Sequence, residues 1–168
     1  ISRRSFLKRA AALSAAAAIP SFWIPSKANA MPGVPFVSAN EKVRIAFIGI
    51  GNRGGEIAQE LYKTGLCEVV ALCDVDMGAP HTQKLISMFP KVPRFQDFRQ
   101  MFDKMADKID AVTVGTPDHS HFPITIEAMA HGKHVYVEKP MARTFQEIEV
   151  MMRAEKKFGV VTQMGNQG

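Results

Sequence analysis

The sequence predicts an α/β domain built on a doubly wound parallel sheet, and three observations predict it. Short apolar segments alternate with longer amphipathic ones from Lys42 onward. The apolar segments are nearly continuous, as in strands buried on both faces of a parallel sheet. A glycine-rich turn follows the first of them, where a strand gives way to a helix. With 168 residues, 46% hydrophobic and 22% charged, the chain has the size and composition of one globular domain.

The elements follow in a regular order. The expected strands are residues 43–48, 68–73, a short piece near 93–95, 111–114, 134–137 and 160–164. The expected helices are residues 54–64, 80–88, 98–107, 122–130 and 145–158. Because the expected helices alternate with the strands, the segments form β-α-β units, and helices cover both faces of a parallel sheet.

Residues 1–30 predict an export signal. The Arg3-Arg4 pair precedes an alanine-rich apolar stretch that is too short for a membrane span of about 20 residues. This leader resembles a twin-arginine signal peptide, which implies the twin-arginine export machinery as a partner and a periplasmic or cell-envelope location. Ala28-Asn29-Ala30 provides a cleavage site, and residues 31–41 form a linker to the domain. A leader retained as an anchor is the alternative.

The positive charge of the chain belongs to this leader. Residues 1–30 hold five of the 21 lysines and arginines and no acidic residue, which leaves 16 basic against 16 acidic residues. The domain itself is therefore formally neutral, and we expect no nucleic-acid partner.

The glycine-rich turn G-I-G-N-R-G predicts a dinucleotide-binding loop. Gly49 permits the tight turn, Gly51 lets a pyrophosphate approach the backbone, and Gly54 lets helix and strand pack closely. Asn52 and Arg53 lie in the same loop, and the free N–H groups of the following helix face the phosphates. A tight turn with a purely structural role is the alternative.

Asp74 predicts NAD as the cofactor. It stands 20 residues beyond Gly54, at the end of the second strand, where a carboxylate accepts hydrogen bonds from the adenosine ribose and repels a 2′-phosphate. NADP is therefore the less favoured cofactor, although Arg53 could accommodate a 2′-phosphate. Asp74 could instead be a solvated loop acid or a helix cap.

Two further loops follow strands, G-T-P-D-H-S-H after residues 111–114 and E-K-P after residues 134–137. Ligands of open α/β sheets bind at this carboxyl edge. Together, G-x-G-x-x-G, T-P-x-x-x-H, G-K-H-V-x-x-E-K-P and the closing G-N-Q resemble the Gfo/Idh/MocA family of sugar and inositol oxidoreductases. The resemblance covers residues 42–168 and implies a Rossmann fold.

The resemblance also implies roles for residues in these loops. The implied cofactor contacts are Thr116, Pro117, His121, Glu138, Lys139 and Asn166. Lys139 is the implied catalytic residue, buried beside the reacting carbon, where it moves a proton at the substrate hydroxyl while hydride passes to C4 of the nicotinamide. Alternatively, Lys139 forms an ion pair that only braces its loop.

Other reactive residue types are expected to be structural. His119 and His121 lack a third ligand block, so we predict no metal site. Extended chain separates Cys67 and Cys73 by about 20 Å at ~3.3 Å per residue, too far for a disulfide. The remaining histidines, which are His81, His131 and His134, are expected to be surface or packing residues.

The family resemblance implies a second α+β domain that supplies the substrate pocket, and the sequence stops after the expected sixth strand. We therefore expect the cofactor-binding part of an NAD-dependent oxidoreductase acting on a sugar, inositol or related polyol, inactive alone and a homo-oligomer at full length. One alternative is an exported NAD-using glycosidase that acts by transient oxidation and elimination, although the intact E-K-P favours a dehydrogenase. A non-catalytic cofactor-binding module is the other.

Overall fold

The computed structural model describes residues 42–166. The predicted leader, residues 1–30, and the predicted linker, residues 31–41, lie outside the described residues, as do residues 167 and 168. Within the described range, no helix has the length and apolar character needed to span a membrane.

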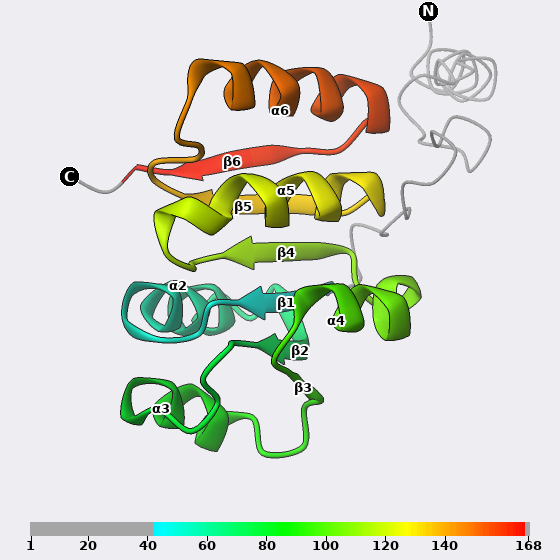
Figure 1. Cartoon of the computed structure of the whole chain (residues 1–168). Helices are drawn as coiled ribbons and strands as arrows, with labels where there is room; N and C mark the ends of the chain where they lie inside the picture. The colour runs from blue at the N-terminus through cyan, green and yellow to red at the C-terminus, as the bar shows by residue number, and fades with distance from the viewer. Residues whose placement is uncertain (1–41, 167–168) are drawn as a thin grey trace, which may run out of the picture. The chain divides into compact units, whose positions relative to one another are not determined.

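A six-stranded parallel sheet forms the centre of the fold, in the order β3-β2-β1-β4-β5-β6 (Figure 1). The strands are β1 (Val43–Ile48), β2 (Cys67–Cys73), β3 (Arg94–Phe95), β4 (Ala111–Val114), β5 (His134–Glu138) and β6 (Thr162–Gly165). The described chain enters the sheet at β1, in its middle, continues outward through β2 to β3, and returns beside β1 to continue outward through β4, β5 and β6. The predicted doubly wound Rossmann sheet is confirmed, and its switch point lies between β1 and β4.

Within residues 42–166, five α-helices cover the two faces of this sheet. They are α2 (Asn52–Lys63), α3 (Pro80–Met88), α4 (Phe98–Met105), α5 (His121–Ala130) and α6 (Phe145–Phe158). Successive residues of β1 enter different apolar clusters, because side chains alternate across a strand. Phe47 packs in the cluster that includes residues of α2 and α3, whereas Ile48 packs in the cluster that includes residues of α4, α5 and α6.

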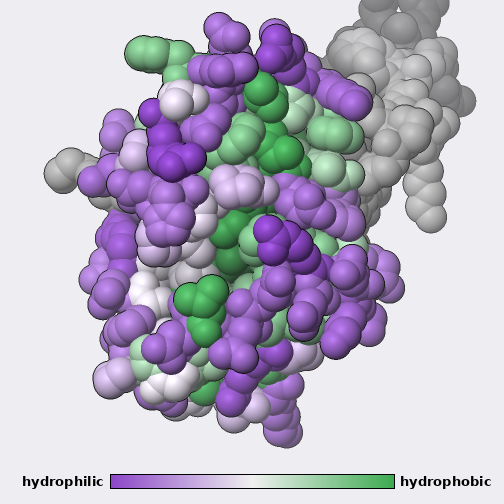
Figure 2. Space-filling model, viewed as in Figure 1, coloured by the Kyte–Doolittle hydropathy of each residue, from purple (hydrophilic) through white to green (hydrophobic). Residues whose placement is uncertain are grey.

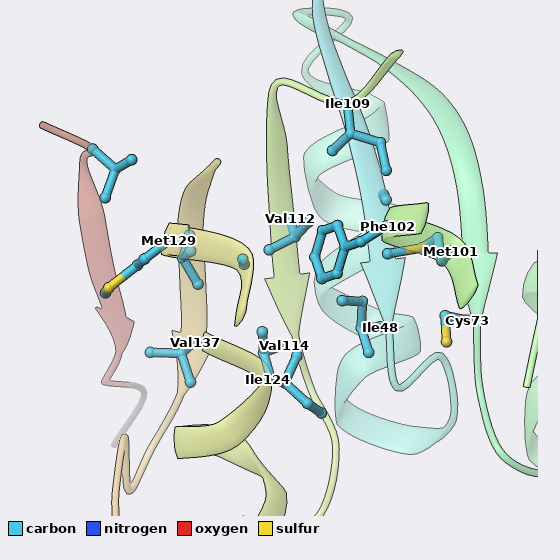
Figure 3. Packing of buried hydrophobic residues seen from close by; sticks show 14 of the residues in the cluster. Ile48, Cys73, Met101, Phe102, Ile109, Val112, Val114, Ile124, Met129 and Val137 are labelled. Carbon is cyan, nitrogen blue, oxygen red and sulfur yellow. The ribbon is translucent and has the colours of Figure 1, made fainter. Parts of the chain in front are cut away.

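The second cluster is centred on side chains from α4 and the middle strands. Figure 3 shows the Phe102 ring beside Val112 and Ile48, and Phe102 is 1% exposed. Its ring also stacks on His131, with centroids 5.0 Å apart. Outside this core, the face seen in Figure 2 is mostly hydrophilic, with small apolar areas between the polar side chains.

Three element boundaries differ from the sequence prediction by two residues, and several others differ by one. Helix α2 begins at Asn52 rather than Gly54, because Gly51 is the extended residue that precedes the helix. Helix α4 ends at Met105, and a 3-10 turn (Ala106–Lys108) completes the expected stretch. Strand β6 begins at Thr162 rather than at residue 160, since the left-handed Gly159 ends α6 and the Val160 N–H still donates to the Glu155 carbonyl.

A partly buried ion pair lies at the amino edge of the sheet. The Asp110 carboxylate, 2% exposed, accepts hydrogen bonds from Arg44 through Nη2 at 2.6 Å, Nε at 3.0 Å and the backbone N–H at 2.8 Å. Burial opposes the charge on Asp110, but these hydrogen bonds outweigh it and hold the pKa of Asp110 below its usual range. The Asp110 carboxylate thus connects the amino ends of strands β1 and β4.

His134, at the start of β5, gives this edge a pH dependence. Its Nδ1 accepts a hydrogen bond from the Val161 N–H at 3.0 Å, which requires that nitrogen to be unprotonated. Burial lowers the pKa of His134 below 6.5, an effect that Asp110 opposes and Lys133 reinforces. The unfolded chain therefore binds a proton at His134 at a higher pH than the folded chain does.

We expect the free energy of unfolding to decrease as the pH falls below about 6.5, by about 1.36 kcal/mol for each unit by which the pKa of His134 is lowered. In His134→Asn, whose carbonyl can still accept from Val161, this contribution to the slope should disappear. Urea denaturation at a series of pH values measures it, with the exposed His119→Asn as the matched control. Equal slopes for wild type and His134→Asn would contradict the prediction.

Candidate cofactor site

Three glycines bring two loops into backbone contact at the carboxyl edge of the sheet. Gly49, at φ +76°, follows β1, and a Cβ there would lie 2.5 Å from the Thr116 nitrogen. A Cβ on Gly115, which follows β4, would lie 2.6 Å from the Gly54 Cα. These contacts confirm the tight turn at Gly49 and the close packing at Gly54. That the loop contacts a cofactor stays a prediction.

The first turn of α2 presents unsatisfied backbone donors to this edge. Gly51 precedes the helix without a side-chain cap, and no acidic residue lies in the first turn. Helix α6, in contrast, begins with a complete capping box between Thr144 and Glu147. An anion is stabilised where N–H groups and the positive end of a helix dipole lack a side-chain partner. The start of α2 therefore suits the diphosphate of a dinucleotide.

Asp74 lies where the sequence predicted it, directly after β2, and is half-buried. Its Oδ2 accepts from the Ile50 N–H of the glycine loop at 2.9 Å, and its Oδ1 accepts from the Asp76 N–H at 3.0 Å. Asp74 does not cap α3, because the residue that precedes that helix is Ala79. Each carboxylate oxygen keeps a free lone pair, so the carboxylate can still accept from two ribose hydroxyls.

Arg53 contacts acidic groups on the other side of the loop. Its Nη1 donates to Glu56 at 2.9 Å, and its Nε lies 3.6 Å from Oε1 of Glu138. Among residues 42–166, Arg53 forms no ion pair with Asp74. The arginine that could have accommodated a 2′-phosphate is thus directed toward the E-K-P loop, which agrees with NAD rather than NADP.

Glu138 is the last residue of β5 and is 6% exposed. Its Oε2 accepts from the Lys139 N–H at 3.3 Å, whereas its buried Oε1 has no hydrogen-bond partner in the described structure. Gly165, which pairs with Glu138 in the sheet, makes room for this carboxylate, because a Cβ there would lie 2.6 Å from Oε1. Arg53 Nε, 3.6 Å away, balances the charge of this oxygen but does not donate a hydrogen bond to it, and a ligand hydroxyl could supply that bond.

His121 joins the T-P loop to the E-K-P loop from a buried position at the start of α5, 1% exposed. Its Nε2 lies 2.7 Å from the Thr116 carbonyl and its Nδ1 lies 2.7 Å from the Pro140 carbonyl. With both nitrogens engaged, His121 holds the two loops together, and that it lines the cofactor stays a prediction. Thr116 remains available, since its buried Oγ1 has no hydrogen-bond partner among the described residues, and Pro117 is exposed.

Lys139 and Asn166 are both exposed. The loop of Lys139 emerges at the sheet edge, and its burial beside a bound nicotinamide stays a prediction. Within residues 42–166, Lys139 forms no ion pair. The alternative role, bracing the loop through an ion pair, therefore has no contact to support it here.

Asn52, the first residue of α2, is exposed and has an unusual φ of +43°.

The other reactive residues do not extend this site. His119 is exposed, and among residues 42–166 no three His, Cys, Asp or Glu side chains cluster as a metal site requires. Cys67 and Cys73 are free and buried, as expected. Burial raises the pKa of Cys73 to about 12, so its thiol is a packing group and not a nucleophile.

Sequence reasoning missed three residues of this edge. Gly115 and Gly165 carried a signal, since each lies within a family motif, but only the fold shows which backbone or carboxylate each makes room for. His81 carried none. Its ring lies against Gly51, in the space that a Cβ on that glycine would fill.

Comparison with known proteins agrees with this geometry. Residues 43–166 match the Gfo/Idh/MocA family model, described as an oxidoreductase family with an NAD-binding Rossmann fold. The alpha-N-acetylgalactosaminidase of Shewanella oneidensis is 31% identical over 163 residues, a match that covers 88% of this chain and 35% of that protein. The chain thus spans about a third of the length of the curated relatives it matches.

Two solved structures share the fold. A dehydrogenase from Chromobacterium violaceum superposes with a TM-score of 0.68 at 26% identity, and myo-inositol 2-dehydrogenase from Lactobacillus plantarum with 0.65 at 26%. Each match covers 74% of this chain and 36% of the other. The chain belongs to the Gfo/Idh/MocA family of oxidoreductases and is its NAD-binding Rossmann domain.

Proposed function

We propose that the protein is an NAD-dependent oxidoreductase that transfers hydride between a sugar, inositol or related polyol and the nicotinamide. The observation that carries the proposal is the arrangement of one sheet edge. The glycine loop and Asp74 are joined by the bond from the Ile50 N–H, and the same loop reaches Glu138 through Arg53. A site for the adenosine half of a dinucleotide is thereby connected to the loop that carries Lys139.

The described residues fit NAD and divide its binding among them. The first-turn N–H groups of α2 bind the diphosphate, and Asp74 accepts from the ribose hydroxyls. Thr116 and Glu138, each with a buried oxygen that lacks a hydrogen bond, contact the second half of the cofactor. When bound, NAD supplies the hydride acceptor. Lys139 moves the proton at the substrate hydroxyl oxygen, and its exposure leaves it accessible to a substrate.

A second candidate function is glycoside cleavage with NAD used transiently. The observation that favours it is the 31% identity to an alpha-N-acetylgalactosaminidase. The intact E-K-P at Glu138–Pro140 favours the dehydrogenase. Both functions need the same cofactor site. They differ in the fate of the hydride, which stays on the cofactor as NADH in the dehydrogenase and returns to the substrate in the glycosidase.

The intact protein, assayed with NAD on free sugars and polyols and on aryl glycosides, distinguishes the two. Production of NADH in step with substrate consumption supports the oxidoreductase. Release of the aryl group without net NADH supports the glycosidase and overturns the first proposal. Binding of NAD with neither reaction, across both substrate classes, identifies a cofactor-binding module.

We also propose that this reaction takes place in the periplasm or cell envelope, on the basis of the twin-arginine pattern at Arg3 and Arg4. Cell fractionation of the protein carrying Arg3→Lys and Arg4→Lys tests the location. Undiminished export of that variant overturns the twin-arginine route.

A further inference from the structure

His81, a residue outside the motifs, occupies the place where a diphosphate would approach the glycine loop. The second glycine of such a loop lacks a side chain so that the pyrophosphate can come close to the backbone. Here a Cβ on Gly51 would lie 2.8 Å from Nε2 of His81, with the ring carbons also within contact distance. The imidazole and a bound diphosphate therefore cannot both occupy this space.

The ring is free to move aside. His81 is exposed and lies in the first turn of α3. In the described part of the chain, neither ring nitrogen of His81 has a hydrogen-bond or ion-pair partner. Rotation about its side-chain torsions would take the ring off Gly51 without breaking a polar contact. Because its backbone is fixed in α3, the displaced ring would stay beside the loop.

We propose that His81 is a diphosphate-binding residue, which covers Gly51 in the free protein and donates a ring N–H to a phosphate oxygen when the dinucleotide binds. This inference rests on the proposed cofactor site and adds a side-chain donor to its backbone donors. Imidazole is suited to the role, because a hydrogen bond to an ionised phosphate oxygen is charge-assisted. The loss of such a bond corresponds to about a tenfold weaker affinity.

Calorimetric titration of the intact, nucleotide-free protein tests the proposal with NAD, with ADP-ribose and with adenosine, which lacks the diphosphate. We expect His81→Ala and His81→Phe to bind NAD and ADP-ribose about tenfold more weakly and adenosine unchanged. His81→Gln, which keeps an N–H donor, should recover part of the affinity. Lys84→Ala is the matched control, because it removes an exposed cation from the same helix.

A direct readout accompanies the titration. The imidazole proton resonances of His81, identified by their loss in His81→Gln, should shift on adding NAD or ADP-ribose and stay in place with adenosine. Unchanged or tighter NAD binding by His81→Ala overturns the role of His81 while leaving the cofactor site intact, since tighter binding would mean that the ring only obstructs. Failure of the wild-type protein to bind NAD overturns the cofactor site itself.

Discussion

Gly49→Ala is expected to destabilise the protein by about 2–5 kcal/mol and to abolish NAD binding. A side chain at φ +76° costs about 1–2 kcal/mol of backbone strain. The added Cβ would also lie 2.5 Å from the Thr116 nitrogen and 2.6 Å from the Gly115 carbonyl carbon. Both are backbone atoms and cannot rotate away, so the two loops must separate, which adds roughly 1–3 kcal/mol. Urea denaturation and NAD titration measure the two effects.

Gly65→Ala provides the matched control. Gly65 follows α2 with φ +73°, nearly the same conformation, but a Cβ there meets nothing within 4 Å. Gly65→Ala should cost only the backbone strain, again about 1–2 kcal/mol, and leave NAD affinity unchanged. If the two variants lost equal stability, the contact between the loops after β1 and β4 would not exist in solution.

Lys139→Met is expected to lower kcat by about 10²–10⁴-fold while NAD affinity stays within about threefold of wild type. The range is that of removing a general acid–base group from a reaction. Because the side chain is exposed and has no ion pair among residues 42–166, stability should change by less than about 0.5 kcal/mol. Steady-state rates of the intact protein, NAD titration and urea denaturation give the three quantities.

The bracing role makes the opposite prediction for the same variant. If Lys139 only braced its loop, Lys139→Met would let the loop change its shape. NAD affinity and stability would then fall, while kcat at saturating NAD would change little. Lys139→Arg sharpens the distinction, since it keeps the charge but not a readily transferable proton. Lys156→Met, an exposed lysine near the end of α6, serves as the control for the general loss of a positive charge.

The fold could be predicted from the sequence because its determinants are local. An apolar run such as residues 45–48 indicates a buried parallel strand, and the glycine turn behind it sets the first crossover. Asp74 was predictable for the same reason, since its distance from Gly54 along the chain fixes its place after β2. The boundaries shifted where one residue's backbone decides, as at Gly51 and Gly159.

The side-chain partners at the site could not be predicted, because they depend on strand order and rotamers. Arg53 meets Glu138 only because β4 and β5 follow β1 in the sheet. His121 was expected to line the cofactor, and the 2.7 Å contacts of both its nitrogens with loop carbonyls were not expected. The expected burial of Lys139 assumed neighbours that the described chain does not place over it.

The ion pair between Arg44 and Asp110 lies at the amino ends of the strands, and every residue of the proposed site lies at the carboxyl ends. Four residues of parallel strand separate the two edges, 45–48 in β1 and 111–114 in β4. Substitutions at the amino edge can therefore change the stability toward heat or acid without touching the residues of the proposed site, and substitutions in the loops at the carboxyl edge can change the substrate range. A mutant library aimed at robustness can be confined to the amino edge, and one aimed at new chemistry to the opposite loops.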